Sequence, residues 1–246
     1  MTTYYVQLTA ESPLQIGAGS LGMIELCQCH IPGRVIWGAL VNTFCNLYWS
    51  QPGDQAYRAV GEAIPQAGLS TFFPLLPVDL QRPRPEQRRR FIPCFPLGQY
   101  VCEERPGVAA CAESTSEAVA AGMPSGKTPA GHALSTREVD GMMLTSIAST
   151  ATSPLLLSAT DQTLHSNDLI SPFLNLGPGP HVRVPTAFAG YLELPGTIAA
   201  NGATVSVNSG LLRTLFSAMR IGGGRKRGWG MVCPQVVEEQ SEKYPG

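Results

Sequence analysis

Residues that interrupt regular structure are the strongest constraint on how this chain folds. The 246 residues include 26 glycines and 21 prolines, spread along the sequence. Glycine weakens the interiors of helices and strands, and proline lacks the backbone N–H that both structures use. We therefore expect a loop-rich chain of short elements, long enough to bury a substantial core in one elaborated domain or two small ones.

Charge is sparse and balanced. Only 14% of the residues are charged, and 17 basic against 18 acidic residues give a formal net charge of −1. A protein that binds nucleic acid through its overall field carries a clear positive excess. Any contact with nucleic acid must therefore come from local clusters of cations.

The seven cysteines give no disulfide framework and no four-cysteine zinc site, because their number is odd and no pair spacing repeats. We expect them to be reduced, in an intracellular protein. Cys27, Cys29 and His30 resemble a metal cluster, but the spacing puts both sulfurs on one face of a strand, where buried thiols are common. A metal site there is the alternative, and the sequence predicts neither a metal nor a cofactor.

The first residues lack the basic region and apolar core of a signal peptide, and no apolar run reaches the roughly 18 residues that span a bilayer. We therefore expect a cytoplasmic protein without membrane contact.

The N-terminal region predicts two strands and a helix. Residues 3–9 alternate between apolar and polar, which is the period of a half-buried strand, and residues 23–29 form a second short strand. Residues 34–49 carry apolar side chains every three to four positions, up to Leu47, which predicts an amphipathic helix. Gly38 weakens this helix by roughly 1 kcal/mol relative to alanine. It therefore serves either close packing or the close approach of a ligand.

The C-terminal region predicts the second helix. Asn208 is a candidate N-cap for an amphipathic helix that starts near Leu211 and ends before Gly222. Residues 182–194 predict extended structure broken at Pro185 and Gly190, residues 155–157 a buried strand, and residues 229–237 a closing strand before a frayed tail.

The middle of the chain has a different composition. Residues 50–130 are rich in proline and lack sustained periodicity, and we interpret them as an insertion. Residues 109–121 within it have too little apolar surface to offset the entropy of ordering. The order of elements, with two helices between terminal strands, predicts an α+β protein: a ferredoxin-like (RRM-like) antiparallel sheet with helices on one face, in a single domain over residues 1–246 with a large central insertion.

One loop gives the strongest indication of function in this sequence. Residues 221–230, which we call the Gly-Arg loop, combine five glycines with Arg225, Lys226 and Arg227 between the second helix and the closing strand. Glycine lets backbone N–H groups approach a phosphate, and the cations form charge-assisted hydrogen bonds with it, which suits an RNA backbone. Trp229 could stack on an unpaired base or pack in the core. The alternative is a tight turn with solvated cations.

Two other nucleotide-binding motifs do not fit this loop. A P-loop and a Rossmann fingerprint both place their glycines between a strand and a following helix, whereas these glycines follow a helix. The P-loop also requires a serine or threonine after its lysine, and Arg227 follows Lys226.

The Gly-Arg loop resembles the glycine-rich motif of the RAMP superfamily, whose members build type III CRISPR effector complexes. Three further segments are similar to the family's patterns in the expected order: Ser-Pro-Leu-Gln-Ile-Gly at 12–17, Ile-Pro-Gly-Arg-Val-Ile-Trp-Gly-Ala-Leu at 31–40 and Phe-Ala-Gly-Tyr-Leu-Glu-Leu at 188–194. Arg34 departs from the small hydroxylic residue that is usual at its position, so it either adds a phosphate contact or faces water.

The resemblance implies a subunit that binds CRISPR guide RNA for antiviral defence. The motifs look most like the type III-D subunit that caps the 5′ tag of the guide beside the large polymerase-like subunit. A backbone subunit along the spacer is the alternative. The implied partners are the guide RNA, the other effector subunits and, indirectly, target RNA. The residues expected to bind RNA are Gly222, Gly223, Gly224, Arg225, Lys226, Arg227, Gly228, Trp229, Gly33, Arg34, Trp37 and His30.

Catalysis is the less favoured reading. Family members that cleave RNA use an aspartate or a histidine, and the candidates here are Asp140, Asp161, Asp168, His30 and His132, none with an identifiable partner. We expect no catalytic residue and keep an RNA endonuclease and a protein-only scaffold as alternatives. The basic run from Arg82 and Arg84 to Arg88, Arg89 and Arg90 either contacts RNA or an acidic subunit, or is a solvated loop.

Overall fold

A computed structural model describes residues 1–49, 53–77, 88–94, 98–105, 108–109, 133–149, 165–177, 183–200 and 203–240. The predicted strand at residues 155–157, the C-terminal tail beyond residue 240 and most of residues 109–121 lie outside this part of the chain, as do Arg82, Arg84, His132 and Asp161. None of the helices in the described part is both long and apolar enough to cross a membrane.

The molecule is an α+β protein, as predicted, built on one large sheet. Strands β14 (Val232–Gln240), β1 (Thr2–Ala10), β11 (Ala187–Leu194) and β4 (Phe73–Pro77) lie side by side in that order, and each neighbouring pair is antiparallel. β1 therefore pairs with β11 along one edge and with β14 along the other. The predicted alternation of β1 is confirmed, since Tyr4, Val6 and Leu8 are buried.

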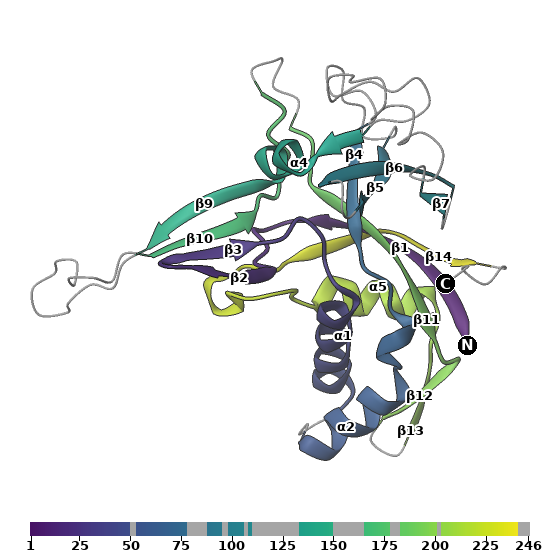
Figure 1. Ribbon diagram of the computed structural model, residues 1–246. Coiled ribbons are helices and arrows are strands. Elements are labelled where there is room, and N and C mark those ends of the chain that lie inside the picture. Colours follow the sequence, from purple (N-terminus) through teal and green to yellow (C-terminus); the bar gives the residue numbers. More distant parts are fainter. Residues whose placement is uncertain are drawn as a thin grey trace, which may run out of the picture.

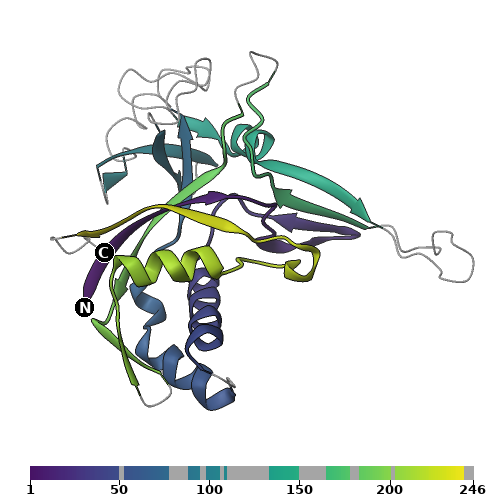
Figure 2. The ribbon, with the colours of Figure 1, turned by 180° about the vertical axis from the view of Figure 1, so that it is seen from behind.

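Two helical crossovers connect these strands. Helix α1 (Gly33–Tyr48) precedes β4, and helix α5 (Ser209–Ala218) joins β11 to β14 through the hairpin β12 (Thr197–Ala200) and β13 (Ala203–Ser206). Helix α2 (Asp54–Ala63) and the 3-10 turn η1 (Gln66–Gly68) follow α1. Figure 1 and Figure 2 show α1, α2 and α5 together on one side of the strands β14, β1 and β11.

Apolar faces of the helices close the core. In α1 the side chains of Ile36, Leu40 and Phe44 are buried, which confirms the predicted stripe, but Leu47 near the end of the helix is 49% exposed and lies off it. The ring of Phe216 on α5 lies 6.4 Å from that of Phe72, and both are fully buried. Helix periodicity therefore predicted the packing face of α1 except at its last turn.

Gly190 does not break β11, contrary to the prediction for residues 182–194. The strand runs through Gly190, which pairs with Val6. A Cβ at Gly190 would lie 2.3 Å from the ring of Phe72. The glycine is therefore required by an aromatic ring that packs on the strand, and not by a bend in the backbone.

Residues 50–130, interpreted as an insertion, include a strand of the large sheet, since β4 pairs with β11. The sheet then continues through β5 (Arg88–Cys94), β6 (Gln99–Arg105) and β7 (Val108–Ala109), and β8 (Ala133–Ser135) pairs with β6. β4 has the sequence Phe-Pro-Leu-Leu-Pro. The strand was not predicted because its two prolines are unusual in a strand and leave no alternation of apolar and polar residues.

Arg90 corrects the prediction of a solvated or ligand-binding basic run. Its side chain is 4% exposed and forms an ion pair with Glu103 on the neighbouring strand. The guanidinium also lies 4.9 Å from the ring centroid of Tyr191 and 5.8 Å from that of Phe73. Arg90 therefore links β5 to β6 and packs on rings of β4 and β11 within the large sheet, whereas Arg89 next to it is exposed.

A second sheet projects away from the first. Its order is β2 (Gly17–Leu21), β3 (Ile24–Cys27), β10 (His165–Ile170) and β9 (Leu144–Ser149), with β3 and β10 parallel. Helix α4 (Thr136–Met143) leads into β9 and begins with a capping box between Ser135 and Glu138. Figure 1 shows α4 on the side of the molecule opposite α1, α2 and α5.

The predicted N-cap of α5 is confirmed, and it gives a direct test of this helix. The side-chain oxygen of Asn208 accepts a hydrogen bond of 2.8 Å from the backbone N–H of Leu211. We expect Asn208→Ala to lower the free energy of unfolding by about 1 kcal/mol, since an N–H at the helix start loses its partner. Urea denaturation followed by circular dichroism measures the change. Asn208→Ser should preserve most of the stability, and an equal loss in both variants would contradict the cap.

Candidate nucleic-acid interface

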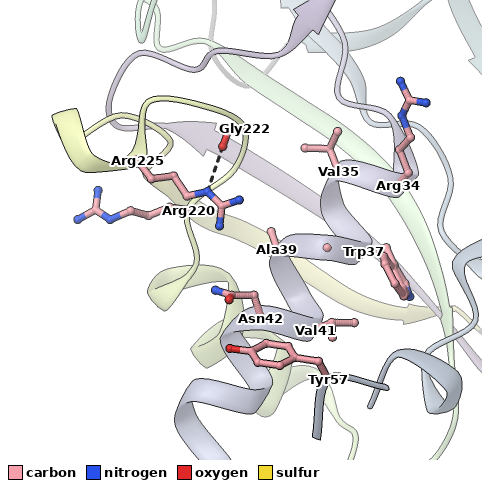
Figure 3. Close-up of a pocket in the computed structure, with 11 residues that line it drawn as sticks. Arg34, Val35, Trp37, Ala39, Val41, Asn42, Tyr57, Arg220, Gly222 and Arg225 are labelled. Carbon is pink, nitrogen blue, oxygen red and sulfur yellow. Dashed lines mark hydrogen bonds between the residues drawn. The ribbon is translucent and has the colours of Figure 1, made fainter. Parts of the chain in front are cut away.

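An open pocket of about 560 Å³ lies between the first half of α1 and the Gly-Arg loop. It joins segments from the two ends of the chain, because α1 follows the first strands and the loop precedes the last one (Figure 3). Four residues predicted to bind RNA line it, together with side chains that were not predicted. The lining residues are Arg34, Val35, Trp37, Gly38, Ala39, Val41, Asn42, Tyr57, Arg220, Gly222 and Arg225.

α1 presents a row of pocket residues one turn apart. Arg34, Gly38 and Asn42 are spaced by four positions, so they follow one stripe of the helix surface. Arg34 and Gly38 are exposed and Asn42 is half-buried, while the opposite face of the helix is anchored in the core. The amphipathic pattern that builds the core therefore also turns this stripe toward the pocket.

Gly38 has no packing role in the described structure. A Cβ placed on it would meet no other atom within 4 Å. Of the two explanations that the sequence offered, close packing is therefore excluded at this position. The open space beside Gly38 belongs to the pocket, which it lines.

The glycines of the Gly-Arg loop serve the fold of the loop itself. Gly222 and Gly230 have positive φ angles of 83° and 92°, and a Cβ at Gly222 would lie 2.3 Å from the backbone oxygen of Gln15. The N–H of Gly223 donates to that same oxygen at 2.9 Å, and the N–H of Gly230 donates to the carbonyl of Pro13. The glycines thus let the loop lie against residues 13–16, which belong to the segment 12–17 that resembles the RAMP pattern.

Backbone amides of the loop are therefore less available than the sequence suggested. Besides Gly223 and Gly230, the N–H groups of Arg227 and Gly228 donate to the carbonyls of Gly224 and Arg225 at 2.8 and 3.2 Å. These four N–H groups are already paired within the protein, so they are not free to donate to a phosphate. Gly228 stands apart, since it is exposed and its Cβ would meet nothing within 4 Å.

The cations of the loop are exposed. Arg225, Lys226 and Arg227 form the exposed 3-10 turn η2 (Arg225–Arg227), flanked by Gly224 and Gly228 in left-handed conformations. Arg225 donates from Nε to the carbonyl of Gly222 at 3.1 Å, the bond drawn in Figure 3. Ion pairing within the described residues is confined to Arg90 and Glu103, so no carboxylate there neutralises the turn.

Arg220 extends the cationic edge and was missed from the sequence. It follows α5 directly, and its Nη1 donates to the carbonyl of Gly228 at 3.4 Å. The available signal in the sequence was its place as a cation directly before the Gly-Arg loop. Arg34 on α1 completes a set of cations that come from both sides of the pocket.

The two tryptophans that were predicted to bind RNA, Trp37 and Trp229, are engaged in packing. The indole N–H of Trp37 donates to the carbonyl of Ile64 at 2.8 Å, and the ring lies against Gly61. These contacts hold α1 against α2. The ring of Trp229 packs against Gly224, where a Cβ would lie 2.0 Å from it, and the guanidinium of Arg227 lies 5.3 Å from its centroid. Trp229 thus shapes the loop, with Arg227 above its ring.

Gly33 and His30 are not among the pocket residues. Gly33 is buried, and a Cβ there would lie 2.1 Å from the backbone oxygen of Leu69. His30 is half-buried near the ring of Phe73, at 6.1 Å between centroids, and desolvation lowers the pKa of its imidazole. Its Nδ1 is buried without a hydrogen-bond partner among the described residues. Neither residue therefore lines the pocket, although Gly33 directly precedes Arg34.

The thiols and the described aspartates lie away from the pocket. Cys27 and Cys29 are buried, as expected, and the Cys29 thiol donates to Oδ1 of Asp140 at 3.2 Å. Burial raises the pKa of Cys27 to about 11, and burial together with Asp140 raises that of Cys29 further. Asp168 lies on β10 opposite Ser146. Neither aspartate lines the pocket.

No protein-family model and no curated protein matches the sequence. Among solved structures, the chain is similar to chains of CRISPR complexes. It resembles one in the type III-B Cmr-beta complex bound to cognate target RNA, with a TM-score of 0.45, 12% identity and coverage of 95% of this chain and 96% of the other. For a chain of apo type III-B Cmr-beta the TM-score is 0.48, the identity 11% and the coverage 98% of both chains. For a chain of a type IV-B CRISPR complex these values are 0.43, 11%, 98% and 92%.

Proposed function

We propose that this protein is a guide-RNA-binding subunit of a type III CRISPR effector complex, and that it binds the RNA backbone along the pocket between α1 and the Gly-Arg loop. The carrying observation is that residues of two separate RAMP-like motifs, Arg34 on α1 and Arg225 on the loop, line one pocket although they lie at opposite ends of the chain. In this proposal the β1, β4, β11 and β14 strands with α1 and α5 are the ferredoxin-like unit.

The chemistry of the pocket supports RNA over a protein partner. Its polar edge consists of guanidinium groups, which form bidentate hydrogen bonds with phosphate. Within the described structure these groups make bonds to carbonyl oxygens and none to a carboxylate. Because the net charge of the chain is −1, this local cluster is the place where a polyanion gains most from binding.

The 5′ tag of the guide is the part that we propose for this subunit, with the other effector subunits, including the large polymerase-like one, as its neighbours in the cytoplasm. Cleavage is not part of the proposal. Asp140 is engaged with Cys29, and Asp140, Asp168 and His30 all lie off the pocket lining.

Purification of the tagged protein from cells that carry its native neighbouring genes tests the proposal. We expect discrete RNAs that begin with one repeat-derived 5′ tag, together with copurifying effector subunits. RNAs that share spacer positions but no common 5′ end would move the subunit to the backbone of the complex. A protein free of nucleic acid would reject RNA binding and favour the scaffold.

A further inference from the structure

We propose that the pocket binds one unpaired nucleotide of the RNA, with its phosphate at Arg220 and Arg225 and its base over Gly38, facing Asn42 and Tyr57. This inference rests on the proposed function, because it presumes that RNA reaches the pocket. It adds a site for a base, where the proposed function requires only contacts with the backbone.

The first argument is the floor of the pocket. Two of the smallest residues, Gly38 and Ala39, lie in the middle of α1, and both line the pocket. Glycine costs a helix stability relative to alanine, and at Gly38 no neighbouring atom within 4 Å requires it. The missing side chain at Gly38 leaves room for a flat group to lie on the helix. The face of a nucleobase is such a group.

The second argument is the polar end of the pocket. Asn42 offers an amide with both donors and an acceptor, and this amide makes no hydrogen bond within the described part of the chain. Tyr57 on α2 lines the pocket beside it, and its hydroxyl donates to Asn46 at 3.4 Å. Figure 3 shows the amide of Asn42 and the ring of Tyr57 at the end of the pocket away from Gly222. A base edge needs this combination of donor, acceptor and aromatic surface.

The third argument is the orientation of the arginines. Arg225 uses Nε for the carbonyl of Gly222, and Arg220 uses Nη1 for that of Gly228. Each guanidinium makes one hydrogen bond, and its other N–H groups have no partner among the described residues, so each has donors for phosphate oxygens. A cationic end and a base-edge end in one pocket match the two ends of a nucleotide.

The size of the pocket agrees with this occupant. A volume of about 560 Å³ lies within the usual range of small-ligand sites, roughly 300–1,000 Å³. One nucleotide fits such a site, whereas a stretch of duplex requires a broad groove. The RNA at this point is therefore single-stranded in our proposal.

Gly38→Leu is the decisive variant, because it fills the floor and leaves every arginine in place. Leucine is a strong helix former, so the helix tolerates it at this exposed position. Gly141→Leu is the matched control, since Gly141 is also an exposed helical glycine with open space around it, on α4 far from the pocket lining. Asn42→Ala is the second variant and removes only the amide.

The readout is the affinity of the purified protein for the copurified guide sequence, made with an abasic site at each position in turn. We expect one position at which the abasic site lowers the affinity of the wild type about tenfold, the usual scale for one stacked base. In Gly38→Leu the intact RNA should bind about tenfold more weakly, and that position should lose its sensitivity. Gly141→Leu should behave as the wild type, and Asn42→Ala should lose discrimination among the four bases.

Two results overturn the inference in distinguishable ways. If RNA binds but every abasic site is neutral, or if Gly38→Leu binds as the wild type does, the pocket holds no base and the proposed function stands. If the wild type binds no RNA at all, the inference and the proposed function both fail.

Discussion

Replacement of Arg225, Lys226 and Arg227 by alanine should lower RNA affinity by about two orders of magnitude near physiological salt, since three exposed charge-assisted contacts of about 1 kcal/mol each are lost. These side chains form an exposed turn without carboxylate neighbours in the described structure, so their charge is available to phosphate. The slope of log K against log salt should become shallower by about 2, because each single-strand phosphate contact contributes about 0.7. Fluorescence anisotropy across a salt series measures both quantities.

A charge-matched control separates local contact from overall charge. Arg137, Arg183 and Arg213 are exposed and lie off the pocket lining. Their combined replacement by alanine removes the same formal charge, and we expect it to change the affinity less than threefold. If both triple variants lose the same amount of RNA affinity, the affinity depends on net charge alone. The turn Arg225–Arg227 would then make no specific contact with RNA.

Two glycines of α1 should respond to alanine in opposite directions. Gly33→Ala should lower the free energy of unfolding by about 2–3 kcal/mol, because the new Cβ overlaps the backbone oxygen of Leu69, which cannot rotate away. Gly38→Ala should raise it by about 0.5–1 kcal/mol, since the methyl group meets no atom and the helix gains propensity. Chemical denaturation of both variants measures the difference.

RNA binding by the folded Gly33→Ala protein then decides the role of Gly33. If the glycine serves only the contact with Leu69, the remaining folded protein should bind RNA with unchanged affinity. If the folded Gly33→Ala protein instead binds RNA more weakly than the wild type, Gly33 belongs to the interface, as the sequence predicted.

The sequence was most informative where one local rule acts alone. Strand alternation identified the buried Tyr4, Val6 and Leu8, and a side chain that can accept from a free N–H identified the cap at Asn208. In both cases the pattern is complete within a few residues. No distant part of the chain is needed to interpret it.

Prediction failed where a distant partner determines the local structure. Gly190 lies within a strand on which the ring of Phe72 packs. Arg90 is buried because it pairs with Glu103 on the neighbouring strand. The sequence shows a glycine and a basic run, and neither partner is adjacent. The same holds for the parallel pairing of β3 with β10, which lie far apart in the chain.

The candidate site was predicted in part for the same reason. The motifs placed Arg34, Trp37, Gly222 and Arg225, which do line one pocket, but Asn42, Tyr57 and Arg220 belong to no motif and are revealed only by the packing of α1, α2 and the loop. Glycine richness was also ambiguous. In the loop it reflects contacts with Gln15 and Trp229, whereas on α1 it leaves space.

The position of β1 has a consequence for biosynthesis. Among the described strands β1 is made first, yet both of its partners, β11 and β14, come late in the order of described elements. Pairing of such distant segments is slow, and until it occurs both edges of β1 are open to other chains. The pocket also needs the last loop, so a ribosome-bound chain that stops before residue 220 has no complete site. In the proposed function, RNA binds only after this loop has been made, and the open edges of β1 need chaperone protection most during synthesis.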